Sequence, residues 1–399
     1  MPSISPSSRV LITNTLSFAA AFAAWVALGP AMRTIAHELQ LTPTSATLLK
    51  VAPILVGSVF RVPIGIATDR FGARVLFPAA LFVGSVAIGA LSLLQAYALL
   101  VCAALLLGVV GTTFVVGVQS VSAWTDSKRQ GAALGIFGAG NAGTAVTTLL
   151  FPLLATAWGW RGAFRCYALV LLLTAVGYRL VTPKPASQGR GLSLGARLAP
   201  LKSRRAWRLG LYYTATFGAF VAATLGMSEI YTDAYGVSAK TAGLLATSFT
   251  LTASLIRIVG GRLSDRFGAR RTLQGALLGI AASLSSVPLH LGLVATVGLV
   301  FTSAVFMGIG MAAVFRYIPD CFPRTVGAVG GIVGAVGGLG GFVLPFLGQW
   351  TKGYFHDPLL GILPLPILAA LALTVQTIWV RLQRDPDTRA GHFSMIPAE

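Results

Sequence analysis

The feature that most constrains this chain is a series of apolar runs, most of them about 20 residues long, that recur from one end of the sequence to the other. A run of that length spans the hydrocarbon core of a bilayer as one α-helix. Only 10% of the 399 residues are charged, compared with about a quarter in a soluble domain. The sequence therefore predicts an all-α, multi-pass membrane protein. Twelve transmembrane helices are expected, near residues 10–32, 45–68, 75–95, 97–121, 131–156, 162–182, 207–231, 241–263, 272–290, 292–316, 327–350 and 360–381.

A polar segment in the middle of the chain separates the first six spans from the last six. We predict an N-terminal six-helix bundle at residues 1–182, a cytoplasmic linker at 183–206, a C-terminal six-helix bundle at 207–384 and a cytoplasmic tail at 385–399. Basic residues lie mostly in every second gap between spans, and this positive-inside pattern places both termini in the cytoplasm. The same distribution accounts for the formal net charge of +19 and argues against a nucleic-acid partner.

Two motifs recur at a fixed offset. RVPIGIATDRFGARV begins at Arg61 and matches RIVGGRLSDRFGARR from Arg257, and 257 − 61 gives an offset of 196 residues. GAALGIFGA from Gly131 matches GAVGGIVGA from Gly327 at the same offset. The two bundles are therefore predicted to be parallel repeats, as in transporters with a site near the midplane between them. The glycines allow close contact between helices. Such contacts can be static packing or surfaces that slide during transport, and the symmetric placement of the glycines favours sliding surfaces.

Arg61 and Arg257 each lie eight residues before the aspartate of a DRFGAR turn, which places them about 12 Å into the bilayer. A charge at that depth is costly and normally faces a partner in the bundle interior. All eleven acidic residues lie at span ends, in loops or in the tail, which argues against an ion pair and leaves snorkelling as the structural alternative. Because arginine presents a planar fork of donors to oxyanions, the pair predicts an anionic substrate.

Four further residues are expected at the same depth, measured from the cytoplasmic ends of their own spans: Phe114, Asn141, Tyr213 and Phe217. Tyr213 and Phe217 are four residues apart and share a helix face. An aromatic ring at mid-membrane more often packs than binds, and for Phe114 alone packing stays the simpler interpretation. With the two arginines, these residues form the predicted substrate-binding layer.

The DRFGAR turns have a separate predicted role as gates. Asp69 is expected near the N-terminus of the span that begins at Gly327, and Asp265 near that of the span that begins at Gly131. A carboxylate there interacts favourably with the helix dipole. With neighbouring arginines, each aspartate would hold the cytoplasmic side closed in one state. The predicted gating residues are Asp69, Arg70, Arg74, Asp265, Arg266 and Arg270.

The twelve-span plan and the two GxxxDRFGxR turns resemble the major facilitator superfamily. A narrower resemblance, to its nitrate/nitrite porter family, comes from WVALGPAM near Trp25, the stretch GTTFVVGVQSVSAWTDSKRQGAALGIFGAGNAG from Gly111, YTATFGAF from Tyr213 and the glycine-rich span from Gly327. One departure lies in the loop sequence Thr125–Ser127, where many members carry a proline.

The resemblance implies that Arg61 and Arg257 bind planar nitrate or nitrite, that Phe114 and Phe217 sandwich the anion, and that Tyr213 and Asn141 add hydrogen bonds. We therefore expect a transporter in the inner (plasma) membrane that works by alternating access. Nitrate/nitrite exchange is favoured because two unpaired arginines should hinder closure of an empty site, and nitrate/proton symport is the rival mechanism.

Other functions remain as alternatives. The first is a facilitator for another small anion, such as a carboxylate, cyanate or phosphate. A proton-driven exporter of hydrophobic compounds is disfavoured by the lack of an acidic residue in the layer, and an enzyme by the lack of a nucleophile or metal-ligand constellation. Three isolated cysteines without CxxC spacing predict no disulfide or metal framework. We expect a monomer in the lipid bilayer, with no cofactor.

Overall fold

The computed structural model describes residues 5–183, 195, 198–323 and 325–384, and these residues are almost wholly helical, without a β-strand. The predicted tail and most of the predicted linker lie outside the described residues. The elements of the first half are α1 (Pro6–Trp25), α2 (Leu28–Glu38), α3 (Pro43–Val59), α4 (Arg61–Phe71), α5 (Ala73–Leu91), α6 (Tyr97–Leu107), η1 (Gly108–Thr112), α7 (Thr113–Ala123), η2 (Ser127–Arg129), α8 (Gln130–Gly138), η3 (Ala139–Ala142) and α9 (Gly143–Val181).

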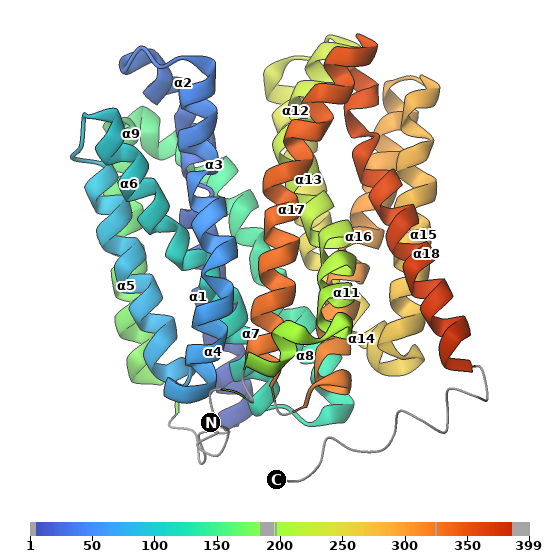
Figure 1. Cartoon of the computed structure of the whole chain (residues 1–399). Helices are drawn as coiled ribbons and strands as arrows, with labels where there is room; N and C mark the ends of the chain where they lie inside the picture. The colour runs from blue at the N-terminus through green and yellow to red at the C-terminus, as the bar shows by residue number, and fades with distance from the viewer. Residues whose placement is uncertain (1–4, 184–194, 196–197, 324, 385–399) are drawn as a thin grey trace.

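The second half also consists of α-helices with short 3-10 or π-helical segments. Its elements are η4 (Ala199–Lys202), α11 (Arg204–Tyr213), the π-helical η5 (Thr214–Gly218), α12 (Ala219–Tyr235), α13 (Ala239–Leu255), α14 (Arg257–Phe267), α15 (Ala269–Ser285), η6 (Val287–Leu289), α16 (Leu293–Cys321), α17 (Val326–Phe355), η7 (Pro358–Ile362) and α18 (Pro364–Arg384). The helices run roughly along one axis, and α1 begins at the same end at which α18 ends, the lower end in Figure 1.

The predicted membrane-spanning fold is confirmed. Ten helical segments of the described chain are long and apolar enough to cross a bilayer, and α3 with α4, bent by 44°, form an eleventh. One of the ten, Ser127–Val181, has 55 residues and breaks at Gly159, whose φ of 69° is left-handed. Counting its two parts separately gives twelve spans, which overlap the twelve predicted ranges.

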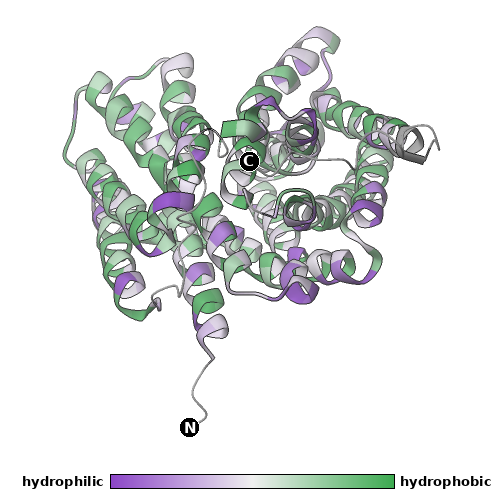
Figure 2. Cartoon of the chain, turned by 60° about the horizontal axis from the view of Figure 1, so that its bottom comes forward, coloured by the Kyte–Doolittle hydropathy of each residue, from purple (hydrophilic) through white to green (hydrophobic). Residues whose placement is uncertain are grey.

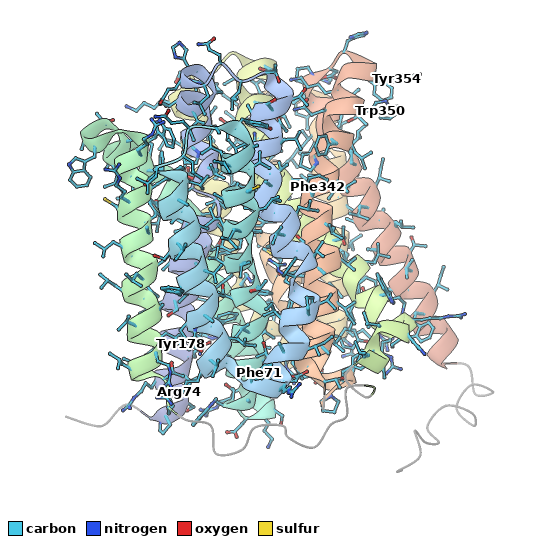
Figure 3. All side chains as sticks on the ribbon, turned by 60° about the vertical axis from the view of Figure 1, so that its left-hand side comes forward. Phe71, Arg74, Tyr178, Phe342, Trp350 and Tyr354 are labelled. Atoms are coloured by element: carbon cyan, nitrogen blue, oxygen red, sulfur yellow. The ribbon has the colours of Figure 1, made fainter. Side chains whose placement is uncertain are left out.

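The outer surface suits lipid. Hydrophobic residues predominate along the helices in Figure 2, and many large apolar side chains are more than half exposed, among them Leu16, Leu173 and Ile367. A soluble protein of this size rarely exposes so much contiguous apolar surface. At the upper end of α17, Trp350 and Tyr354 stack at 5.5 Å and are exposed (Figure 3), as is typical of aromatic residues at the membrane interface.

The internal repeat extends to the helix boundaries. α4 and α14 each have 11 residues, begin at the repeated arginine and end before a glycine with positive φ, 78° at Gly72 and 85° at Gly268. All of these positions differ by 196. The break before α4 has a local cause, because Pro63 lacks the N–H that would continue the helix of α3. Each repeated arginine is thus placed at a mid-span break, inside the bundle.

The two halves approach most closely below these breaks. A Cβ at Gly65 of α4 would lie 2.5 Å from the Gly327 carbonyl oxygen of α17. A Cβ at Gly131 of α8 would lie 2.5 Å from the Gly261 carbonyl oxygen of α14. Only glycine permits these helix crossings. The glycine-rich segments therefore bring the lower parts of the halves into backbone contact.

Candidate functional site

Arg61 is fully buried at the start of α4, and only some of its guanidinium donors have hydrogen-bond partners. Its Nε donates to the Gly111 carbonyl oxygen at 3.2 Å, and its Nη1 donates to the Gly334 carbonyl oxygen of α17 at 2.7 Å. Its Nη2 has no hydrogen-bond partner among the described residues. The guanidinium therefore joins the two halves and keeps one donor group free for a ligand.

Arg257 occupies the matching position at the start of α14 and has weaker contacts. Its side chain is 1% exposed, its Nη1 lies 3.7 Å from the Met311 sulfur, and its Nε has no partner in the described part of the chain. Its Cζ lies 5.4 Å from the centroid of the Phe114 ring, and that of Arg61 lies 5.7 Å from the same centroid. The two guanidinium groups therefore converge on one aromatic ring.

Neither arginine has a carboxylate partner in any of the five salt bridges found over residues 5–183, 198–323 and 325–384. A buried charge without a counter-ion carries a desolvation cost of several kcal/mol. Aromatic faces offset part of it through cation–π attraction. This arrangement is chemically suited to an anion, which would neutralise the positive charge and accept hydrogen bonds from the free N–H groups.

Three of the predicted aromatic residues form a stack beside the arginines. The Tyr213 ring is parallel to that of Phe217 at 4.9 Å and to that of Phe114 at 6.3 Å. Phe217 also lies 5.4 Å from the Arg61 Cζ. The buried Tyr213 hydroxyl lies near the Arg257 guanidinium without forming a hydrogen bond of normal geometry. The structure thus brings Phe114, Tyr213 and Phe217 together with both arginines.

Asn141 lies in η3, one helical turn after Gly138, which packs against the Arg257 side chain: a Cβ at Gly138 would lie 2.6 Å from its Cζ. Asn141 is fully buried, and its amide nitrogen and oxygen are both without partners among the described residues. Leaving a buried amide unsatisfied costs about 1–3 kcal/mol for each group. No hydrogen bond joins Asn141 to either arginine in the described structure, so its amide keeps both donor and acceptor available.

Two aromatic residues of the layer were not predicted. Phe315 of α16 packs edge-on against Phe114 at 4.7 Å and against Tyr213 at 4.8 Å. The Trp25 ring lies 5.8 Å from the Arg61 Cζ, and its Nε1 donates to the Pro53 carbonyl oxygen at 3.0 Å. Trp25 could have been found within the WVALGPAM motif. Phe315 lies near the end of its span, and nothing in its spacing indicates that it turns inward.

Asp265 lies at the N-terminus of α8, as predicted. Its carboxylate accepts hydrogen bonds from the backbone N–H groups of Gly131 at 2.9 Å and Ala132 at 2.8 Å. The Nε of Arg316 donates to the same carboxylate at 2.9 Å, and Arg316 also contacts Asp320 and the Ser127 carbonyl oxygen. These bonds join the two halves at the lower end.

Arg316 was not predicted as a gating residue, because it falls in the last turns of a predicted span. The available signal was its spacing of four residues from Asp320, which is typical of a helical ion pair.

Asp69 occupies the matching position in the first half with different partners. It accepts a hydrogen bond from Gln119 Nε2 at 2.5 Å, and a Cβ at Gly327 would lie 2.5 Å from its Oδ1. It is therefore beside the first turn of α17, as predicted. The bonds that cross between the halves at this end include those from Gly131 and Ala132 to Asp265 and from Arg316 to the Ser127 carbonyl oxygen.

The arginines of the two motifs lie elsewhere. Arg74, at the lower end in Figure 3, donates to the carbonyl oxygens of Thr182 and Arg179 within its own half. Arg70 and Arg266 each lie over the ring of the following phenylalanine at 5.2 Å. The Arg270 carbonyl oxygen accepts a hydrogen bond from Gln376. In this conformation their described contacts are local to one half.

The upper end is open where the lower end is closed. A cavity of about 400 Å³ lies between α3 of the first half and α12, α17 and η7 of the second, with Lys50, Glu229 and Lys352 among its lining residues. Three salt bridges found among the described residues at this end each stay within one half: Arg161 with Glu38 at 2.5 Å, His290 with Asp357 at 3.0 Å, and Lys352 with Asp233. The structure therefore combines a closed lower half, a buried central layer and a hollow upper half.

Comparisons with known proteins agree with this architecture. The family model of the Major Facilitator Superfamily matches residues 15–238 and 209–397. Among solved structures, the human organic anion transporter MFSD10 superposes with a TM-score of 0.78 at 13% identity, covering 94% of this chain and all of that one. The transporter FucP in its outward conformation gives a TM-score of 0.73 at 16% identity, covering 93% of this chain and 99% of that one. These likenesses show the fold.

Sequence relatives identify the family within that fold. The chain is 37% identical to the probable nitrate/nitrite antiporter NarK1 of Thermus thermophilus, over 94% of this chain and 91% of the relative. It is 35% identical to the probable nitrate/nitrite transporter NarK2 of Mycobacterium tuberculosis (90% and 93%) and 31% identical to the nitrite extrusion protein of Bacillus subtilis (86% and 89%). The chain therefore belongs to the nitrate/nitrite porter family of the major facilitator superfamily.

Proposed function

We propose that this chain carries nitrate, nitrite or both across the plasma membrane by alternating access, with the anion held between Arg61 and Arg257. The observation that carries the proposal is the pair of buried guanidinium groups, each with an unpartnered donor, on one aromatic ring and without a carboxylate partner in the described structure. A planar oxyanion supplies both the missing charge and the missing acceptors. The names of the relatives agree with this substrate class.

The other residues of the layer have distinct proposed roles. The parallel rings of Phe114 and Phe217 confine a planar anion, while the Tyr213 hydroxyl and the Asn141 amide donate hydrogen bonds to its oxygens. Each of these two polar groups is buried and has no hydrogen-bond partner in the described part of the chain, so a bound anion removes a desolvation cost that the empty site carries. Recognition through fixed donors favours small planar anions over tetrahedral ones.

We further propose that residues 1–182 and 207–384 rock as two units, with the lower end on the cytoplasmic side. The hydrogen bonds from the Gly131 and Ala132 N–H groups to Asp265, and from Arg316 to the Ser127 carbonyl oxygen, close that side in the present conformation. Arg70, Arg74, Arg266 and Arg270 act as gating residues in the alternate state. Since two unneutralised guanidinium groups repel one another in an empty site, closure around an anion is favoured over closure without one. That preference supports exchange of one anion for another.

The decisive experiment uses proteoliposomes loaded with nitrite and supplied with labelled nitrate outside. Exchange predicts uptake that requires internal nitrite and does not respond to a pH gradient. Uptake that requires the gradient instead indicates nitrate/proton symport. Arg61→Lys and Arg257→Lys should abolish uptake, because lysine does not reproduce the planar fork, while Arg161→Lys, at the surface ion pair with Glu38, serves as the matched control. Transport of a carboxylate, cyanate or phosphate without nitrate or nitrite would overturn the proposed substrate.

A further inference from the structure

A basic cavity, separate from the central layer and from the upper cavity, lies toward the lower end of the second half. Its volume is about 150 Å³. Its walls come from three helices of the same half, α11, α16 and α18. The lining residues are Arg205, Arg208, Leu209, Tyr212, Tyr317, Cys321, Gln376 and Trp379. Since no lining residue belongs to the first half, the cavity is not on the route between the halves.

Arg208 is held in this cavity with its donors unused. Its Cζ lies 3.4 Å from the centroid of the Trp379 ring, so the indole covers one face of the guanidinium. Its Nε and Nη1 are buried and have no hydrogen-bond partner in the described structure. Stacking of this kind leaves the edge of the guanidinium available, and the edge is the part that binds oxyanions through paired N–H groups. The geometry thus presents a fixed donor edge without an acceptor.

The surroundings add positive charge. Arg205, Arg208 and Arg270 all lie close enough to the Tyr317 hydroxyl to act on it electrostatically. None of the three takes part in a salt bridge within the described residues, and the neighbouring Asp320 is bound to Arg316. The cavity therefore concentrates cationic charge and phenolic hydroxyls, which is the composition of a phosphate-binding site.

The depth of the cavity matches a headgroup. Trp207 follows Ala206 on α11, is exposed, and donates its Nε1 hydrogen to the Leu201 carbonyl oxygen at 2.8 Å. An exposed tryptophan with its polar atom satisfied near a helix end is typical of the membrane interface. Gln376 also lines the cavity, and its buried Oε1, which has no partner among the described residues, can accept a hydrogen bond from a headgroup hydroxyl. Basic pockets between helices at this level bind anionic headgroups in other membrane proteins.

We propose that the cavity formed by Arg205, Arg208, Tyr317 and Trp379 binds a phosphate group, either that of an anionic phospholipid such as phosphatidylglycerol or free inorganic phosphate. This site is separate from the transported anion and does not depend on its identity. Arg208 is five residues before Tyr213 on α11, about 7.5 Å along the helix axis. An occupied site therefore fixes α11 against α16 and α18 near the central layer.

The test uses the purified full-length protein in phosphatidylcholine nanodiscs, without nitrate or nitrite. Bound lipid is counted by native mass spectrometry, and thermal unfolding is followed while short-chain phosphatidylglycerol or inorganic phosphate is titrated. We expect saturable binding and a rise in Tm with at least one of them, with Arg208→Gln weakening the apparent affinity about tenfold or more. Saturation by the lipid alone identifies a headgroup site, and saturation by inorganic phosphate identifies a free-phosphate site.

Arg179→Gln is the matched control, since Arg179 is an exposed arginine at the same end of the first half. It should bind like the unmodified protein. If Arg208→Gln fails to fold, Arg205→Gln and Trp379→Leu replace it. Binding of neither probe, or equal binding by the Arg208 and Arg179 variants, would overturn the proposal.

Discussion

Arg61 and Arg257 occupy equivalent positions in the two halves, yet their surroundings differ. Arg61 donates two hydrogen bonds to backbone carbonyl oxygens, one of them on α17 of the other half, while the side-chain hydrogen bond of Arg257 found among the described residues is a long one to the Met311 sulfur, at 3.7 Å. Backbone carbonyls are strong acceptors and a thioether is a weak one. The repeat therefore sets where each arginine lies, and the divergence of the halves sets how firmly it is held.

The gates of the two halves also have different partners. Asp265 accepts hydrogen bonds from two backbone N–H groups and from Arg316. Asp69 accepts one from the Gln119 amide and lies beside the first turn of α17. We infer that Arg61 and the Asp265 gate hold the present conformation, and that Arg257 moves onto the anion.

The largest expected effect separates the two arginines. Arg61→Gln and Arg257→Gln should each lower nitrate uptake at least about 100-fold, because loss of one partner from a buried charged contact costs about 2–5 kcal/mol. In nitrate-free protein their Tm values should differ. Arg257→Gln removes a buried charge that has little compensation and should raise Tm, while Arg61→Gln also loses the bond to Gly334 and should give a lower Tm than Arg257→Gln.

These values are measured by uptake in proteoliposomes and by thermal unfolding with and without nitrate. Nitrate should raise the Tm of the unmodified protein and of neither variant. Equal Tm values for the two variants would contradict the idea that one arginine is anchored and the other is not.

A smaller effect is expected at the gates. Asp265→Asn weakens charge-assisted hydrogen bonds worth about 1.5–3 kcal/mol, so it should shift the balance toward the conformation open at the lower end about tenfold. Asp69→Asn should shift the balance in the same direction. Accessibility of single cysteines placed in the lower and upper cavities reports this balance, with Asp126→Asn, at an exposed residue, as the control. An Asp69 variant with unchanged kinetics and balance would remove Asp69 from the gate.

The Tyr213 hydroxyl should contribute less to nitrate transport than the arginines or the gates. Tyr213→Phe keeps the ring stack and removes one donor near Arg257, so the KM for nitrate should rise about threefold to tenfold. Tyr231→Phe is a matched control, because the Tyr231 hydroxyl is also buried and unpartnered in the described structure but lies on α12. Equal effects of the two substitutions would show that Tyr213 acts through packing alone.

Much of this arrangement was predictable because it follows from charge and repetition. A charged residue at bilayer depth must face inward, and the offset of 196 placed Arg61 opposite Arg257 and Asp265 at the start of α8. The break before α14 was not predictable in the same way. Pro63 explains the break before α4, but Val259 stands at the matching position of α14, so no proline accounts for the second break.

The direction of side chains near helix ends was the other feature that could not be predicted from the sequence. Phe315 and Arg316 are adjacent on α16, yet one packs against Phe114 and the other binds Asp265. Which of two neighbouring residues turns inward depends on the partner helix of the other half, and that information is absent from local spacing.

The smallest expected effect tests how weakly Arg257 is held. Met311→Leu removes the sulfur that the Arg257 Nη1 contacts while nearly preserving side-chain volume. If that contact contributes little, the KM and the maximal rate of nitrate uptake should each change less than about twofold. Gly334→Ala affects the anchored arginine instead, since a Cβ there would lie 2.9 Å from the Arg61 Cδ, and it should reduce uptake more strongly. A Met311 variant as impaired as the Gly334 variant would show that the sulfur positions Arg257, and the two arginines would then be anchored alike.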